Sequence, residues 1–298
     1  MSLIVSSFSQ GLFWAIMAIG VFITFRILDI ADLTAEGSFP LGAAAAASLI
    51  VAGVNPLLAT LLAVVAGALA GLVAGFLHTK MQIPAIITGI LVLTGLYSIN
   101  IRVMGQSNLA LLNEETLLTY MQDLGLSVQM APLVLGVLSL ALVIGIIVWF
   151  MNTEYGLALR TTGDNKIMAE ANGIETDSMI ILGYMISNSM IALSGALLAQ
   201  YNGYSDISMG TGTIVIGLAG VVIAEVLVKD ARIFKRLLSI FAGAFIYRLV
   251  IDMIMRQTAI AITPSDIKII SAVILAVILW APQVSIGRKK KKVTERRG

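Results

Sequence analysis

Few side chains in this sequence can carry acid–base or ligand-binding chemistry. Only 12% of its 298 residues are charged, cysteine is absent, and His78 is the one histidine. Thiol catalysis, disulfide bonds and cysteine-ligated metals are therefore excluded. We expect no metal site and no catalytic role for His78. The chemistry that remains is that of carboxylates, amides and basic groups set among apolar residues.

Ionisable residues inside apolar segments are the first candidates for function, because a charge is costly within a membrane. Asp32 and Glu36 interrupt an apolar stretch near the N-terminus, and we expect both to line a pathway for a polar solute. Uncharged polar residues in other apolar segments are further candidates for this pathway, although such residues also serve helix packing: Asn100, Tyr184, Asn188 and Asn202.

A second set of charges is spaced for ion pairing. Glu225 and Lys229 are four residues apart, and Arg248, Asp252 and Arg256 repeat at the same interval. Residues four apart share one face of a helix, where opposite charges can pair. We therefore predict structural ion pairs that involve Glu225, Lys229, Arg248 and Asp252.

The elements that position these side chains are predicted to be membrane helices. Apolar residues make up 58% of the chain and its mean hydropathy is +0.97, whereas soluble domains average about 25% charged residues. Several stretches reach the roughly 20 apolar residues that cross a bilayer, and a β-barrel would show short alternating segments instead. We predict one all-α polytopic bundle over residues 1–298, with about nine spans near residues 10–28, 37–53, 57–77, 84–101, 131–151, 178–201, 213–228, 237–255 and 267–281.

The distribution of Lys and Arg predicts which side each loop faces, since cytoplasmic loops are enriched in both. The tail at residues 284–298 is strongly basic, whereas no Lys or Arg precedes Arg26. An odd number of spans then places the N-terminus outside, and the tail is also suited to bind anionic membrane lipid. The loops expected to be cytoplasmic are those at residues 78–82, 152–177 and 229–236.

The second predicted span is irregular. Gly37 and Pro40 closely follow Asp32 and Glu36, and Gly and Pro together break a helix. We expect non-helical backbone here, which is tolerated at membrane depth where protein or a water-filled cavity surrounds it. A simple tight turn between two helices is the alternative.

Residues 152–177 form a long polar insert with helix signals of its own. Asp164 is a suitable N-cap, residues 165–172 can form two helical turns, and Gly173 suits the left-handed position that ends a helix. Ala169 and Gly173 are small enough to allow another surface to approach. One face of this helix would carry Ile167, Met168, Ala171 and Ile174. We interpret the insert as a docking element for a cytoplasmic partner; an interfacial helix that lies on lipid is the alternative.

Residues 155–174, YGLALRTTGDNKIMAEANGI, resemble the cytoplasmic coupling segment of the branched-chain amino acid/ribose-type permeases of ABC importers. The positions that fit that family's pattern are Gly156, Gly163, Asn165, Ala169, Gly173 and Ile174. Three further stretches resemble the same family in the same order along the chain: residues 32–38, 71–97 and 210–212.

The resemblance implies a division of labour in the cytoplasmic membrane of a bacterium. Two permease chains would form the pathway, two cytoplasmic ATPase subunits would bind ATP and magnesium, and an extracytoplasmic binding protein or lipoprotein would deliver the solute. This chain has no G-x-x-x-x-G-K-[ST] sequence, so we expect it not to be an enzyme and to bind neither a cofactor nor nucleic acid. The residues that the resemblance assigns to ATPase coupling are Arg160, Gly163, Asp164, Asn165, Ala169, Gly173 and Ile174. Arg102 and Arg256 would face a docked binding protein outside.

The departures from the family pattern bear on the substrate. The family's G-x-x-N-G sequence has no asparagine here, and the extra first helix of its sugar branch is missing. The resemblance therefore favours an amino acid, and an aromatic one in particular; a sugar or nucleoside is the alternative within the family. Outside it, a secondary transporter would suit broken helices but lacks a clear proton or sodium site here. A membrane enzyme acting on lipids would need clustered acidic or histidine residues.

Overall fold

A computed structural model describes residues 3–228, 232–255, 269, 272–273 and 276, and these residues are mostly helical. The helices in the first half of the chain are α1 (Leu3–Phe22), its π-helical continuation η1 (Ile23–Ile27), α2 (Ala35–Val51), α3 (Pro56–Thr79), α4 (Ala85–Met104), α5 (Leu117–Asp123) and α6 (Ala131–Met151). Those in the second half are α7 (Glu154–Asp164), α8 (Lys166–Ala171), α9 (Thr176–Asn202), the 3₁₀ helix η2 (Ile207–Gly210), α10 (Thr213–Leu227) and α11 (Ile233–Met255). Two short strands, β1 (Asn108–Ala110) and β2 (Tyr204–Asp206), pair antiparallel.

The predicted class of polytopic membrane bundle is confirmed. Within the described part of the chain, 7 helices are long and apolar enough to cross a membrane, and α2 is a shorter apolar helix. The ninth predicted span, near residues 267–281, lies outside the described residues, so the count of nine stays a prediction.

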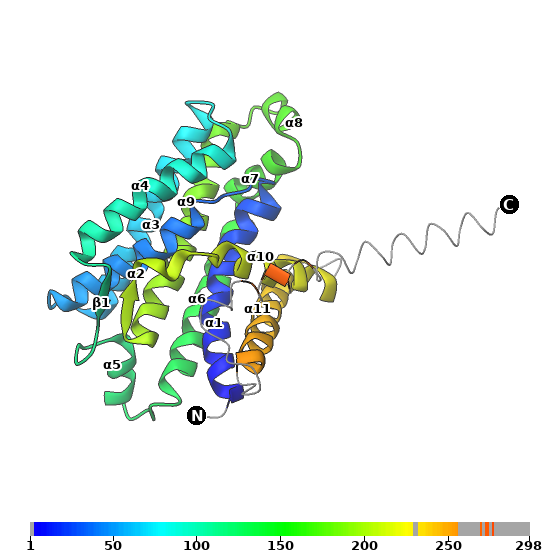
Figure 1. The fold of residues 1–298 in the computed structure, drawn as a ribbon. Helices are drawn as coiled ribbons and strands as arrows, with labels where there is room; N and C mark the ends of the chain where they lie inside the picture. Colours follow the sequence, from blue (N-terminus) through cyan, green and yellow to red (C-terminus); the bar gives the residue numbers. More distant parts are fainter. Residues whose placement is uncertain (1–2, 229–231, 256–268, 270–271, 274–275, 277–298) are drawn as a thin grey trace, which may run out of the picture.

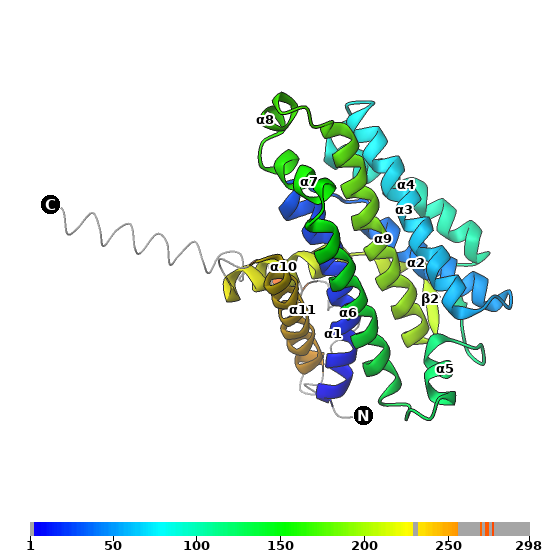
Figure 2. The ribbon, with the colours of Figure 1, turned by 180° about the vertical axis from the view of Figure 1, so that it is seen from behind.

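The bundle has two distinct ends, which Figures 1 and 2 show from opposite sides. Helices α7 and α8 lie at one end, whereas the start of α1 and helix α5 lie at the other. Helix α9 packs against α1, α2 and α3, and α1 packs in addition against α6, α10 and α11. The pair α1 and α9 is therefore the centre around which the other helices are arranged.

Small residues set how closely the helices approach. A Cβ atom at Gly71 of α3 would collide with the backbone of Tyr184 in α9, and one at Gly42 of α2 would collide with the backbone of Ala192. Membrane helices pack through such small residues because lipid provides no hydrophobic driving force between them. The glycines of α3 thus serve packing within this chain.

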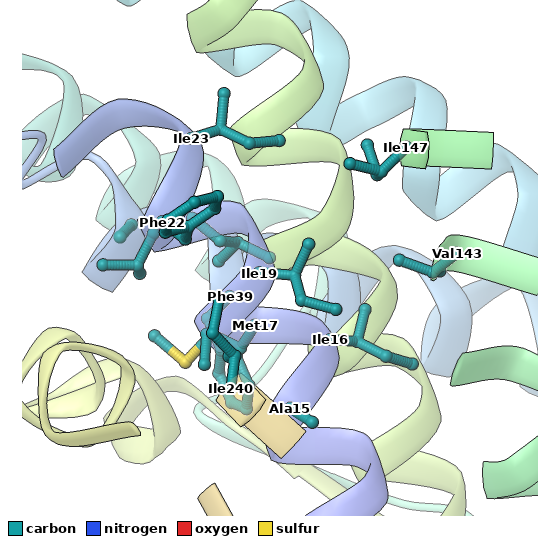
Figure 3. Packing of buried hydrophobic residues seen from close by; sticks show 14 of the residues in the cluster. Ala15, Ile16, Met17, Ile19, Phe22, Ile23, Phe39, Val143, Ile147 and Ile240 are labelled. Carbon is teal, nitrogen blue, oxygen red and sulfur yellow. The ribbon is translucent and has the colours of Figure 1, made fainter. Parts of the chain in front are cut away.

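The core between the helices is formed by apolar side chains of α1. Ile16 and Ile19 of α1 lie near Val143 and Ile147 of α6, as Figure 3 shows. All four of these side chains are buried. Because α1 and η1 are enclosed by protein along most of their length, they can hold a polar side chain such as that of Thr24 inside the bundle.

The interruption before α2 lies earlier in the chain than predicted. Residues 28–34 are non-helical, and α2 continues through Gly37 and Pro40, so the predicted break at these two residues is wrong. Pro40 lies in the second turn of α2, where it lacks the N–H that would bond to the carbonyl of Glu36. Gly210 packs directly against this carbonyl. The proline therefore opens a contact between α2 and the segment before α10 and does not end the helix.

Candidate functional site

Three of the predicted pathway residues meet in one buried cluster. The carboxylate of Asp32 accepts hydrogen bonds from the backbone N–H of Thr34 at 2.9 Å and from Nδ2 of Asn188 at 2.9 Å. The same Nδ2 donates to the carbonyl of Tyr184 at 3.0 Å. These side chains are all buried, so the non-helical segment after η1 is fastened to α9 in the interior of the bundle.

Several polar atoms in and around this cluster are buried without a hydrogen-bond partner among the described residues. They are Oγ1 of Thr34, Oγ of Ser38, Oδ1 of Asn100, the hydroxyl of Tyr184 and Oδ1 of Asn188. A buried polar group that is not satisfied costs about 1–3 kcal/mol. Unsatisfied buried polar groups are few in native proteins, and each calls for an explanation such as a functional role or an ordered water.

Glu36 connects the first turn of α2 to the start of α10. Its Oε1 accepts a hydrogen bond from the backbone N–H of Gly212 at 3.0 Å. A carboxylate is favourable at this position because the N-terminus of a helix carries partial positive charge. The two helices that begin inside the bundle are thereby held together at their N-terminal ends.

A cavity of about 480 Å³ lies beside this junction. Its lining includes Glu36 and Asn100, two of the predicted pathway residues, and Nδ2 of Asn100 donates to the carbonyl of Gly37 at 3.2 Å. The remaining polar or aromatic lining residues were not predicted: Thr94, Tyr97, Ser208 and Thr211. The spacing of three residues between Thr94, Tyr97 and Asn100 places them on one face of α4, a signal that the sequence did contain.

Asp206 holds the segment that contributes Ile207 and Ser208 to the lining of this cavity. Its carboxylate accepts hydrogen bonds from Nδ2 of Asn108 at 2.9 Å and from the backbone N–H of Ser208 at 2.7 Å. Partial burial raises the pKa of Asp206, but hydrogen bonds from Ser208 and Asn108 favour the charged form more strongly and hold this pKa below its ordinary value. The carboxylate therefore stabilises the segment at neutral pH, and this contribution is lost as the pH falls through the lowered pKa.

The predicted coupling residues lie at the opposite end, on α7 and α8. Nη2 of Arg160 donates to the carbonyl of Met151 at 2.7 Å, which fastens α7 to the end of α6. A Cβ atom at Gly163 would collide with the carbonyl oxygen of Ile27, the last residue of η1. Arg160 and Gly163 thus hold α7 against the bundle, and Gly163 brings α7 into direct contact with the end of the first membrane helix.

The cap of the short helix lies one residue later than predicted. Oδ1 of Asn165 accepts a hydrogen bond from the backbone N–H of Met168 at 3.0 Å, so Asn165 is the N-cap of α8. The prediction of Asp164 is wrong because α7 extends through Asp164, and Asn165 is the first residue with extended backbone. Gly173 has a φ of 80°, which confirms its predicted left-handed position after the helix.

Helix α8 lies at this end of the molecule (Figure 1) and carries exposed apolar side chains. The side chains of Ile167 and Met168 are 81% and 60% exposed, whereas Ala169 is fully buried. Ile174 packs against the core of the bundle. The predicted shared face is therefore divided, because Ile167 and Met168 point outward while Ile174 packs inward. Ala169, which was predicted to let another surface approach, is instead buried within this chain.

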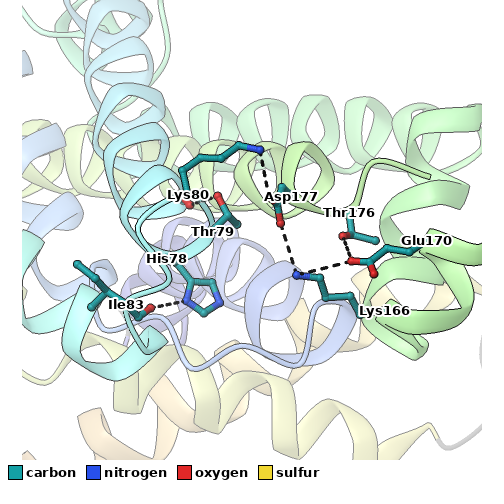
Figure 4. Close-up of polar contacts among 9 residues, drawn as sticks. His78, Thr79, Lys80, Ile83, Lys166, Glu170, Thr176 and Asp177 are labelled. Atoms are coloured by element: carbon teal, nitrogen blue, oxygen red, sulfur yellow. Dashed lines mark hydrogen bonds and ion pairs between the residues drawn. The ribbon is translucent and has the colours of Figure 1, made fainter. Parts of the chain in front are cut away.

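A network of charged groups orients α8, as Figure 4 shows. The carboxylate of Asp177 lies 3.0 Å from Nζ of Lys80 and 3.4 Å from Nζ of Lys166. Oγ1 of Thr176 donates to Glu170 at 2.8 Å. Exposed ion pairs of this kind contribute about 0–1 kcal/mol each, so the network fixes the position of α8 more than it stabilises the fold.

The predicted ion pairs are confirmed in one case and changed in the other. Arg248 and Asp252 pair at 3.0 Å. Glu225 pairs at 2.7 Å with Arg26 of η1, a partner that the four-residue spacing did not predict, and Lys229 lies outside the described residues.

The remaining predicted positions do not join either site. Asn202 is exposed at the end of α9, away from the buried cluster and the cavity lining. Arg102 is exposed near the end of α4, at the end of the bundle opposite α8. Arg256 lies outside the described residues, so docking of a binding protein at these two arginines stays a prediction.

Comparison with known proteins identifies the family. The family described as "Branched-chain amino acid transport system / permease component" matches residues 3–281. The tyrosine transport system permease protein of Clostridioides difficile (strain R20291) is 39% identical over 97% of this chain and 95% of its own length. An uncharacterized protein of Rickettsia prowazekii (strain Madrid E) is 32% identical over 94% of this chain and 97% of its own length.

A more distant relative is the autoinducer 2 import system permease protein LsrC of Photorhabdus luminescens, which is 30% identical over 54% of this chain and 47% of its own length. No solved structure matches the chain. The family match extends over nearly the whole sequence and agrees with the predicted resemblance. This chain is therefore a member of the branched-chain amino acid transport system permease family.

Proposed function

We propose that this chain forms the membrane pathway of an ATP-driven importer for an aromatic amino acid, with tyrosine as the first substrate to test. As a member of its family, the chain is the permease component of an ABC-type import system in the cell membrane. The observation that carries the substrate assignment is the 39% identity to a tyrosine transport system permease over 97% of the chain.

The chemistry of the cavity supports an amino acid as its occupant. A volume of about 480 Å³ falls within the roughly 300–1,000 Å³ of small-molecule sites. The carboxylate of Glu36 would attract an ammonium group, and the hydroxyls of Ser208 and Thr211 would bond to polar atoms. Tyr97 and Leu93 would cover an aromatic ring.

The exposed apolar surface of α8 supports an ATPase as the cytoplasmic partner. Ile167 and Met168 extend from a short helix that the ion pair between Lys166 and Asp177 holds to the start of α9, as expected for a docking element. ATP and magnesium would be bound by the ATPase, and no cofactor is assigned to this chain. A second permease copy and an external binding protein complete the proposed assembly.

Two contacts would carry a displacement of α8 to the pathway. The first runs from Gly163 of α7 to Ile27, and from there through residues 28–34 to Asp32. The second is the ion pair between Arg26 and Glu225, which joins the same end of α1 to α10. The first contact ends at the segment that leads into α2, and the second ends near the C-terminal end of α10. Because α2 and α10 are joined at Glu36 and Gly212 beside the cavity, closure of the ATPase would change the shape of the cavity.

The test is uptake into vesicles that contain this permease, its ATPase and its binding protein. We expect ATP-dependent accumulation of labelled tyrosine that unlabelled tyrosine or tryptophan reduces and that ribose leaves unchanged. Competition by ribose but not by tryptophan would assign the pathway to a sugar and overturn the proposed substrate.

A further inference from the structure

A small pocket at the α8 end of the bundle gathers three arginines from three separate elements. It has a volume of about 190 Å³ and is lined by Arg26 of η1, Arg160 of α7 and Arg236 of α11. Asp164 is the one acidic side chain in the lining, and Phe22 contributes an apolar wall. Arg26 is paired with Glu225 at 2.7 Å, and Nη1 of Arg236 donates to the carbonyl of Val228 at 3.2 Å. The three guanidinium groups still outnumber the two carboxylates beside them, so the pocket carries an excess of positive charge.

The contacts of Arg160 fix its orientation without cancelling its charge. Nη2 donates to the carbonyl of Met151 at 2.7 Å, which is a neutral acceptor. Nε is buried and has no hydrogen-bond partner among the described residues. Since a guanidinium offers five donors in a rigid fork, Arg160 retains directed donors for an acceptor that enters the pocket.

The pocket is close to the surface that lipid would cover. Trp149 and Tyr155, at the junction of α6 and α7, are 70% and 64% exposed, and exposed Trp and Tyr side chains mark the interface between membrane and water. Phe25 and Phe234, which are neighbours of pocket-lining residues in the sequence, are also exposed. Apolar side chains beside a cluster of guanidinium groups fit a ligand that has a charged head and hydrocarbon chains.

We propose that this pocket binds the phosphate group of an anionic membrane lipid. Arginine forks bind phosphate oxygens with two parallel hydrogen bonds, and basic pockets between membrane helices hold lipid headgroups on the cytoplasmic side. A lipid bound here would bridge η1, α7 and α11. It would thus stabilise the contact between α7 and the end of α1.

The experiment measures lipid binding to the full-length protein by native mass spectrometry in detergent. Phosphatidylglycerol and phosphatidylcholine are titrated separately, and inorganic phosphate is the competitor that represents a free anion. Arg236→Gln removes one fork from the pocket. Lys235→Gln is the matched control, because it removes the same charge from the adjacent, exposed residue outside the lining.

We expect the wild type to prefer phosphatidylglycerol, and Arg236→Gln to weaken its binding about tenfold. Lys235→Gln should change the affinity less than twofold. Arg236→Lys keeps the charge but not the fork, so an intermediate loss of lipid affinity is expected. If Arg236→Gln does not fold, the affinity of Arg236→Lys tests the proposal in its place. Equal affinities for the two lipids, or equal losses in Arg236→Gln and Lys235→Gln, would overturn the proposal. Complete displacement of the lipid by millimolar phosphate would reassign the pocket to a free anion.

Discussion

At the scale of single residues, two carboxylates near the start of α2 have different surroundings and therefore different roles. Asp32 is buried and accepts hydrogen bonds from Thr34 and Asn188. Glu36 reaches the cavity and accepts a bond from the N-terminus of α10. The first side chain fixes the non-helical segment, and the second combines a structural contact with a charge that a solute can meet.

Replacement of Asp32 by Asn should lower the stability of the protein. The amide oxygen could still accept one of the two hydrogen bonds from Thr34 and Asn188, but the NH2 group would then face the other donor, and a buried hydrogen bond that is lost in this way costs about 1–3 kcal/mol. Thermal unfolding in detergent measures the loss, with Asp123→Asn on the exposed end of α5 as the control. Unfolding at the same temperature in both variants would show that Asp32 does not hold the segment.

Replacement of Glu36 by Gln removes the negative charge but keeps an oxygen that can accept a hydrogen bond. The amide oxygen can still accept the bond from Gly212, so the unfolding temperature should fall only slightly, through loss of the favourable charge at the N-terminus of α10. Loss of the charge should reduce tyrosine uptake about tenfold, since a hydrogen bond to a charged group contributes about 1.5–3 kcal/mol. Glu115→Gln, in an exposed loop away from the cavity, is the control for uptake. Undiminished uptake in Glu36→Gln would remove this carboxylate from solute recognition.

At the scale of elements, the molecule connects a surface helix to an interrupted membrane helix. Helix α7 touches the end of η1 through Gly163, and η1 leads into the segment that holds Asp32. A π-helical turn such as η1 is often found at functional sites. In the proposed mechanism, the contact between α7 and η1 is the point at which docking and pathway would be joined.

A methyl group at Gly163 should disturb this contact. Gly163→Ala forces α7 away from the carbonyl of Ile27, whereas Gly145→Ala in α6 meets nothing within 4 Å and is the matched control. We expect Gly163→Ala to retain ATP hydrolysis by the assembled complex but to lower the tyrosine transported per ATP by at least about fivefold, from an energetic change near 1 kcal/mol. A normal transport ratio would contradict the proposed route.

At the scale of the whole molecule, the two ends of the bundle should face different compartments. The chain has no cysteine, so single cysteines can be labelled without background. Ser127→Cys, in the exposed loop between α5 and α6, should react with a membrane-impermeant maleimide in intact cells. Asn172→Cys, just after α8, should react only once the membrane is permeabilised. Reaction of both sites in intact cells would show that α8 cannot reach a cytoplasmic ATPase.

Local features of the chain were well predicted from sequence. Apolar length predicted the membrane helices, and the left-handed preference of glycine predicted the end of α8 at Gly173, because both depend on neighbours in the sequence. The N-cap of α8 was predicted at Asp164 but lies at Asn165. The length of α7 depends on its packing against η1, and the local sequence does not indicate this packing.

Contacts between distant residues could not be predicted in the same way. Asp32, Tyr184 and Asn188 were each recognised as polar groups in apolar segments, but their meeting depends on how α9 crosses the bundle. The pairing of Arg26 with Glu225 was missed because its partners come from the first and the tenth helix. Spacing within one helix favours local pairs and contains no information about such crossings.

The surface of α8 allows the most direct test of ATP-driven import through this chain. Ile167→Glu places a charge on the most exposed part of α8, and Leu124→Glu, which is equally exposed at the opposite end, is the matched control. The measurement is ATP-dependent tyrosine accumulation in vesicles, together with the amount of ATPase that co-purifies with each variant. The account predicts that Ile167→Glu lowers both tyrosine accumulation and the amount of co-purified ATPase by about tenfold, without a change in unfolding temperature. The control Leu124→Glu should leave all three quantities unchanged. Full ATPase binding and full accumulation in Ile167→Glu would contradict the account.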